Sequence, residues 1–271
     1  GKGIGIILTN GDDITKLAGI ETLSNPLPPL MAVNTTAGTA SELTRHAVIT
    51  NEATKLKFVV VSWRNIPLVS FNDPMLMLDI PKDLTAATGM DTFVQCVEPY
   101  VSTNRNEITD AQAIEGIKLC EESLREAYAN GHNVEARTKM VEAEMLGGMA
   151  FNNADLGYVH AMAHQLGGQY DAPHGVCCAM LLPIVEKYNI IACPERFAQL
   201  AEIMGEDTTG LSTMEAADLS IKAMRRFCDD VNIPRSIKAI GAKPADFEMM
   251  AENALKDGNA FSNPRKGTKE D

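Results

Sequence analysis

The sequence lacks the features that mark several large classes of protein. It has no uninterrupted apolar stretch of about eighteen residues, which a membrane-spanning helix needs. Its first residues, GKGIGIILTNGDD, lack the basic segment and long apolar core of a secretory signal peptide. It also lacks an excess of basic residues, because the formal net charge is -12, so the average surface repels phosphate backbones and anionic lipids. These absences predict a cytoplasmic protein that binds neither nucleic acid nor membrane.

The six cysteines show neither CxxC spacing nor the framework of a small disulfide-bonded domain. We therefore predict that they are buried, reduced thiols. The adjacent Cys177 and Cys178 follow His174 closely, so both are candidate neighbours of any site that includes this histidine.

The 271 residues, of which 45% are hydrophobic and 22% charged, suffice for one large globular domain or two modest ones. The opening GIGIILT predicts the end of a helix or a short strand. Apolar runs at Leu30 to Val33, at residues 55–62 and at residues 67–73 predict strands. Residues 1–80 are therefore predicted to form a partial α/β domain.

From Pro81 onward, apolar residues recur at three- and four-residue spacing with few β-branched runs. This periodicity predicts helices near residues 82–101, 107–130, 133–153, 155–168, 174–190, 194–204, 212–231 and 244–256. We therefore expect α/β plus all-α architecture, with a helical domain over residues 81–271.

Three of the five histidines lie in the segment HAMAHQLGGQYDAPH, residues 160–174. His160 and His164 are four residues apart on a predicted helix, so their side chains share one face. We expect the Gly167-Gly168 pair to break this helix and return His174 toward that face. Because neutral imidazole is a common metal ligand, the cluster predicts a divalent metal site. The alternative is that one or two of these histidines only bond to the backbone.

A catalytic divalent metal usually also binds a carboxylate, which offsets its charge. In the segment TAATGMDTFVQCVE, Asp91 lies early in an apolar helix, and Gln95 follows one turn later on the same face. A carboxylate on the buried side of a helix needs a partner, which a metal would supply. Alternatively, Asp91 is a helix-start residue favoured by the helix dipole.

The loop NTTAGTASE, residues 34–42, has the composition of a cradle for an oxyanion or phosphate. Thr35, Thr36 and Thr39 offer hydroxyls, and Gly38 permits a ligand to approach the backbone closely. The same composition fits a capped helix start, with Thr39 or Ser41 as the cap.

Together, the segments NTTAGTASE, AATGMD, FNNADLGYVHAMAHQLGG and YDAPHG resemble the iron-containing (group III) alcohol dehydrogenase family. The resemblance extends over nearly the whole chain. The segments GIETLSNPLPP, TKLKFVVVSWRN and ALKDGNAFSNPRKG are most similar to the branch that acts on 1,3-propanediol. The resemblance implies a dehydroquinate synthase-like architecture, in which a metal lies between a dinucleotide-binding domain and a helical domain. It also implies a homo-oligomer built from dimers.

The resemblance also implies an enzyme that interconverts a small alcohol or diol and its aldehyde, using NAD(H) and Fe(II) or zinc. The implied substrates are 1,3-propanediol and 3-hydroxypropionaldehyde. The implied metal ligands are Asp91, His160 and His174, and His164 would lie near the nicotinamide and substrate as a catalytic residue. The residues that fall where the family contacts its cofactor are Thr35, Thr39 and Lys57.

The sequence departs from the family pattern at several places. Gln95 stands where the family has a second histidine ligand, and its amide oxygen is a weak, neutral donor. Ile184 replaces a histidine that is common in the family's LLPHV context. The chain begins after the position of the family's Gly-rich pyrophosphate loop and stops before its last helix, so we expect a truncated sequence. These departures leave two alternatives, a zinc-dependent glycerol dehydrogenase and a non-catalytic divergent subunit.

Overall fold

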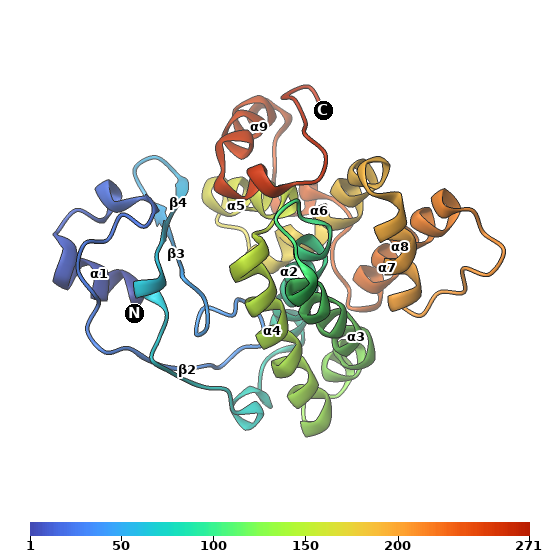
Figure 1. Cartoon of the computed structure of the whole chain (residues 1–271), viewed down its shortest axis with the longest axis horizontal. Helices are drawn as coiled ribbons and strands as arrows, with labels where there is room; N and C mark the ends of the chain where they lie inside the picture. The colour runs from blue at the N-terminus through green and yellow to red at the C-terminus, as the bar shows by residue number, and fades with distance from the viewer.

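The computed structural model describes residues 1–271 and begins with a small α/β part (Figure 1). Its helix α1 spans Lys2–Asn10. Five short strands follow: β1 (Gly19–Ile20), β2 (Met31–Val33), β3 (His46–Asn51), β4 (Leu56–Val61) and β5 (Val69–Phe71). Strand β4 pairs in parallel with β1 and antiparallel with β3, while β2 pairs in parallel with β5. This part has its own small core, formed by Ile6, Leu23, Ala47 and Val60.

The strand predictions are confirmed for β2, β4 and β5, and the opening segment forms a helix, one of the two predicted alternatives. Strand β3 was not predicted. Its sequence, HAVITN, has only three apolar residues, and most of its positions are half-buried or exposed. The strand forms because it pairs with β4 along its whole length, from His46 opposite Val61 to Asn51 opposite Leu56.

The remainder of the chain forms eight α-helices close to the predicted ranges, which confirms the expected α/β plus all-α architecture. They are α2 (Lys82–Val101), α3 (Glu107–Ala129), α4 (Val134–Ala154), α5 (Tyr158–Tyr170), α6 (His174–Asn189), α7 (Pro194–Ile203), α8 (Thr213–Asp230) and α9 (Phe247–Lys256). Two of them begin with capping boxes, at Asn106 and Ser212, which satisfy backbone N–H groups of the first turn.

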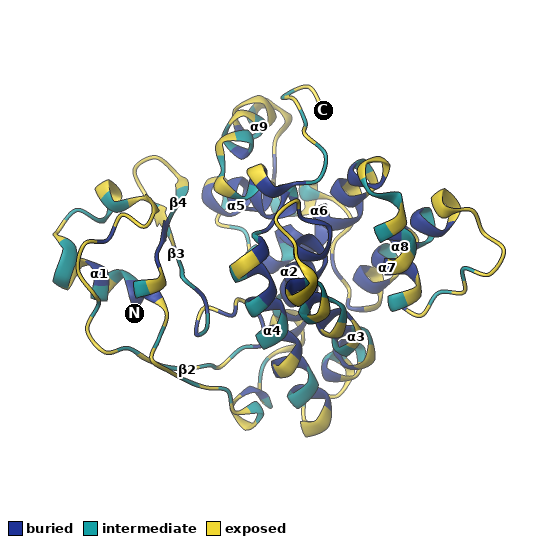
Figure 2. Ribbon diagram, in the orientation of Figure 1, coloured by how far each residue is buried: buried dark blue, intermediate teal, exposed yellow.

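Helix α2 lies at the centre of the helical part and packs against α3, α4 and α6. Every residue from Gly89 to Val101 is buried, as the dark core of Figure 2 illustrates. This stretch carries Asp91, Gln95 and Glu98 into the interior. Buried charged groups need compensating partners, so the centre of the helical part must contain a polar site.

One segment, His174–Ala192, has the length and composition of a membrane-spanning helix, and 67% of it is buried inside the protein. It comprises α6 and the turn that follows. Its apolar residues, including Leu182, belong to the main hydrophobic core.

The predicted helix break at Gly167 and Gly168 is wrong, because α5 continues through both glycines. A Cβ atom on Gly168 would lie 2.3 Å from the carbonyl oxygen of Lys55. The glycine therefore allows the turn between β3 and β4 to approach α5. The chain instead reverses after α5 at Asp171, whose φ of 51° is left-handed, and His174 then opens α6.

Candidate metal centre

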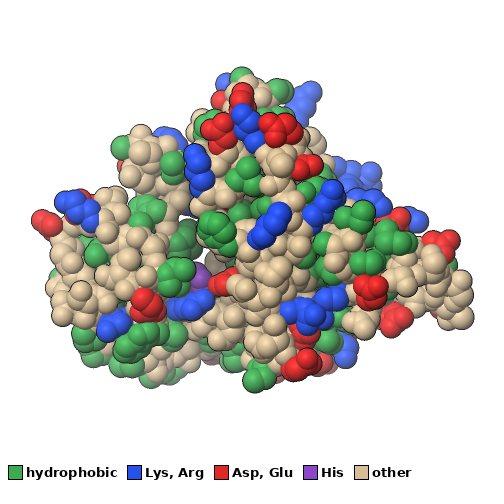
Figure 3. All heavy atoms as spheres, turned by 45° about the horizontal axis from the view of Figure 1, so that its top comes forward, with side chains coloured by type: hydrophobic (Ala, Val, Ile, Leu, Met, Phe, Trp, Pro, Cys, Tyr) green, Lys and Arg blue, Asp and Glu red, His purple; other side chains and the backbone are tan.

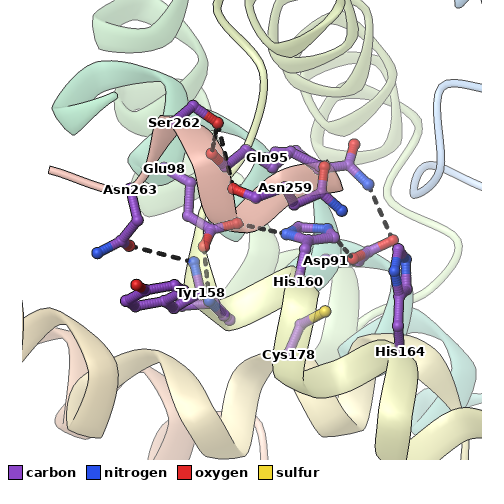
Figure 4. Close-up of polar contacts among 12 residues, drawn as sticks. Asp91, Gln95, Glu98, Tyr158, His160, His164, Cys178, Asn259, Ser262 and Asn263 are labelled. Carbon is purple, nitrogen blue, oxygen red and sulfur yellow. Dashed lines mark hydrogen bonds and ion pairs between the residues drawn. The ribbon is translucent and has the colours of Figure 1, made fainter. Parts of the chain in front are cut away.

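Four potential metal ligands from three helices converge in the helical part: Asp91 of α2, His160 of α5, and His174 and Cys178 of α6. One ligand atom from each side chain lies within 4.8 Å of all the others. Asp91 Oδ1 is 3.5 Å from His160 Nε2 and 3.6 Å from His174 Nε2. The structure thus brings together the three predicted ligands and adds Cys178, whose position beside Asp91 and His160 is visible in Figure 4.

Several polar atoms at this point have no hydrogen-bond partner. They are Asp91 Oδ1, His160 Nε2 and Gln95 Oε1, all of them buried. Gln95 is nevertheless tied to the site, because its Nε2 donates a 3.0 Å hydrogen bond to Asp91 Oδ2. Unpartnered buried polar atoms are rare in folded proteins, and a carboxylate with two imidazoles is a common donor set for a divalent metal. The residues therefore fit such a metal.

The protonation states of His174 and Asp91 suit metal binding. Burial lowers the pKa of His174 to about 3, so this imidazole is neutral at pH 7. Burial by itself raises the pKa of Asp91, but His174 and His160 outweigh that effect, and the pKa is lowered overall. Asp91 is therefore an ionised carboxylate that can offset the charge of a cation.

Glu98 supports the site from the same face of α2, three residues after Gln95. Its Oε2 accepts a hydrogen bond from His160 Nδ1, and its Oε1 accepts one from the backbone N–H of Val159 (Figure 4). Sequence analysis missed Glu98, although its spacing from Asp91 places both on one helix face. A carboxylate behind a ligating histidine fixes the orientation of the ring.

His164 lies next to the cluster. Its ring stacks on that of His174, with centroids 5.5 Å apart. Its Nδ1 forms a 2.8 Å contact with Asp257 Oδ2, a residue that follows α9. No local sequence signal identifies Asp257, because 93 residues separate the two partners.

The loop of residues 34–42 connects β2 to β3 and is fixed to the helical part. Glu144 of α4 accepts hydrogen bonds from the backbone N–H of Ala40, at 2.9 Å, and from Asn34 Nδ2, at 2.6 Å. Gly38 packs so closely on α2 that a Cβ atom would lie 2.8 Å from Thr88 Cβ. Glu144 was not predicted, since the contacting loop is more than 100 residues away in the sequence.

The threonines of this loop remain accessible: Thr35 and Thr39 are exposed and Thr36 is half-buried. No helix starts here, because the next regular element is β3. Lys57 of β4 lies beside α5, where a Cβ atom on Gly167 would be 3.1 Å from its Nζ. Figure 3 shows a histidine side chain at the hollow between the N-terminal part and the helices.

Comparison with known proteins agrees with this geometry. Residues 1–74 match the iron-containing alcohol dehydrogenases, and residues 85–271 match the C-terminal part of the Fe-containing alcohol dehydrogenase family. The chain is 62% identical to 1,3-propanediol dehydrogenase of Citrobacter freundii, covering 100% of this chain and 70% of that protein.

Solved structures give the same result. An alcohol dehydrogenase from Oenococcus oeni is 81% identical and superimposes with a TM-score of 0.96, covering 99% of this chain and 70% of that one. A sulfoacetaldehyde reductase from Bifidobacterium kashiwanohense in complex with NAD+ is 28% identical, with a TM-score of 0.84 over 99% of this chain and 69% of that one. The chain belongs to the iron-containing alcohol dehydrogenase family.

Proposed function

We propose that this protein is an NAD-dependent oxidoreductase that interconverts 1,3-propanediol and 3-hydroxypropionaldehyde. The observation that carries the proposal is the convergence of Asp91, His160 and His174 at one buried point. The substrate pair is supported by the 62% identity to a 1,3-propanediol dehydrogenase.

Asp91, His160 and His174 are the proposed metal ligands, with Gln95 as a weaker candidate beside Asp91. A bound Fe(II) or Zn(II) would supply a Lewis acid that stabilises negative charge developing on the substrate oxygen. The chain's own contribution is orientation. Glu98 holds the His160 ring, and the Gln95 amide holds one oxygen of Asp91, which leaves Oδ1 directed at both histidines.

His164 is the proposed catalytic residue for proton transfer. Because Asp257 accepts from Nδ1, Nε2 is the ring atom left to exchange a proton with the substrate or with a water molecule. Stacking on His174 keeps the ring next to the metal ligands. The pair thus has the arrangement of an acid–base group with a positioning carboxylate.

The proposed cofactor-binding residues are Thr35, Thr36, Gly38, Thr39 and Lys57. Gly38 packs the loop against α2 while Thr35 and Thr39 stay exposed, and Lys57 offers a cation beside α5. A cation and exposed hydroxyls suit the phosphate and ribose groups of NAD.

We further propose that residues 1–80 belong to the dinucleotide-binding domain and residues 81–271 to the metal-binding domain. The protein would act in the cytoplasm as a homo-oligomer built from dimers, without nucleic-acid or membrane partners. The net charge of -12 supports the last point, because it repels phosphate groups.

The test combines metal analysis with NADH-dependent reduction of 3-hydroxypropionaldehyde after loading with Fe(II) or Zn(II). We expect about one metal ion per chain and metal-dependent turnover. His174→Ala should lose both, whereas His132→Ala, at a histidine whose side chain is 73% exposed, should retain both. Absence of bound metal, or equal turnover without it, would overturn the proposal. Faster zinc-dependent oxidation of glycerol would replace the proposed substrate.

A further inference from the structure

We propose that Cys178 is a fourth protein ligand of the metal and binds it through a thiolate. This inference rests on the metal site proposed above. Cys178 lies one turn after His174 on α6, so both side chains project from the same helix face. Its side chain is fully buried, and its sulfur lies at the point where Asp91, His160 and His174 meet.

Three separations between the ligand atoms are close to those of a tetrahedral site. Bond lengths of about 2.0 Å to nitrogen or oxygen and about 2.3 Å to sulfur place tetrahedral donors about 3.3 Å apart, or about 3.5 Å where sulfur is involved. Asp91 Oδ1 lies 3.5 and 3.6 Å from the two imidazole nitrogens. Cys178 Sγ lies 3.7 Å from His174 Nε2. The sulfur therefore occupies the place of a donor atom.

The neighbouring Cys177 shows that burial alone does not explain this placement. Both cysteines are completely buried on α6. Only Cys178 belongs to the group of converging ligand atoms. Core packing would be satisfied by either cysteine, whereas metal binding requires the sulfur to face the histidines.

Donor strength favours Cys178 over Gln95 as the fourth donor. A thiolate is an anionic ligand, whereas the Gln95 amide oxygen is a weak, neutral one, and the thiol proton is released to solvent on binding. The Gln95 amide also already donates to Asp91, so its role is to position that carboxylate.

The inferred donor set has consequences for metal choice and access. A thiolate is a soft ligand, and its addition to two imidazoles and a carboxylate favours zinc. The His174 side chain is 26% exposed, against 3% for His160 and 4% for Asp91. Because four protein ligands would fill a tetrahedral site, substrate access requires a fifth coordination position, and the exposure of His174 puts that position on its side.

Cobalt(II) loading of the full chain tests the inference, because a thiolate bound to cobalt gives an intense near-ultraviolet charge-transfer band. We expect the band in the wild-type protein and in Cys177→Ser, the matched control. Cys178→Ser should lose the band and bind zinc more weakly by more than the roughly 10- to 100-fold that loss of an outer partner costs. Gln95→Ala should keep the band.

X-ray absorption of the zinc-loaded wild-type protein provides a second measurement that needs no variant. We expect one sulfur scatterer at about 2.3 Å. Bound metal with only nitrogen and oxygen scatterers, or a band that persists in Cys178→Ser, would overturn this inference and leave the proposed function intact. Absence of any bound cobalt or zinc would overturn both.

Discussion

His160 and Glu98 form a buried pair in which Nδ1 of the imidazole meets Oε2 of the carboxylate, with side chains 3% and 1% exposed. Because Nδ1 is engaged, Nε2 is the ring atom that faces Asp91. The same carboxylate accepts a hydrogen bond from Val159 N at the start of α5. One glutamate thus fixes both the beginning of a helix and the orientation of a proposed metal ligand.

Glu98→Gln should weaken metal binding by about 10- to 100-fold, because the amide no longer provides a charged acceptor for His160 Nδ1. The amide oxygen can still accept from Val159 N, so we expect the fold to persist. Chelator competition measures the affinity. Glu122→Gln, at an exposed ion pair with Lys139, is the control. Equal affinities of the two variants would contradict the assigned role of Glu98.

Glu144→Ala should weaken NADH binding by about tenfold or more, since the loop of residues 34–42 loses two buried hydrogen-bond acceptors. Metal content should not change, because Glu144 does not contact the ligand cluster. Fluorescence titration with NADH provides the measurement. The control is Glu142→Ala, an exposed position on the same helix. If Glu144→Ala binds NADH like the wild type, the loop does not contribute to the cofactor site.

Glu186→Gln should stabilise the protein at alkaline pH. Burial, with a smaller contribution from nearby Glu98, raises the pKa of Glu186 from 4.5 to about 8. The folded state therefore favours the protonated carboxyl of Glu186. The contribution of this group to the free energy of unfolding is fully present below pH 4.5 and is lost as the pH rises through about 8.

The neutral amide removes this loss, so the variant should gain about 2 to 4 kcal/mol over the wild type near pH 8. The gain in stability should vanish below pH 4.5, where the wild-type glutamate and the variant glutamine are both neutral in the folded and unfolded states. Denaturant unfolding at several pH values measures it. A difference in stability that stays constant with pH would show that Glu186 does not titrate as described.

Gly168→Ala should destabilise the protein by about 1 to 3 kcal/mol, because the new methyl group would overlap the Lys55 carbonyl. The turn between β3 and β4 would move away from α5 and displace Lys57. Thermal unfolding and NADH titration should therefore both report the change. Gly3→Ala in α1 meets only ordinary contacts and should not destabilise. Similar melting temperatures for both variants would argue against the close packing at Gly168.

The helices could be predicted because each carries its own signals, such as the apolar periodicity after Pro81 and the caps at Asn106 and Ser212. Strand β3 could not, since HAVITN is stabilised by its neighbour β4 more than by its own composition. Gly168 gave a misleading signal. Because Gly168 has no side chain, the Lys55 carbonyl can lie close to it, and α5 continues through this glycine without a break.

The site shows the same division. Residue types and spacing made Asp91 and the three clustered histidines candidates, and the family resemblance selected Asp91, His160 and His174, which the structure brings together. Glu98 was detectable only by following the helix face beyond Gln95. The partnership of His164 with Asp257 depends on tertiary structure alone.

The central position of α2 also determines how the site opens. Hydrogen exchange at amides of a fully buried helix generally requires unfolding of the whole core. We therefore expect the amides of the buried stretch Gly89–Val101, which includes Asp91, Gln95 and Glu98, to be among the slowest-exchanging in the protein. Small molecules should reach the site from the side of α6, where His174 is 26% exposed, and not through α2.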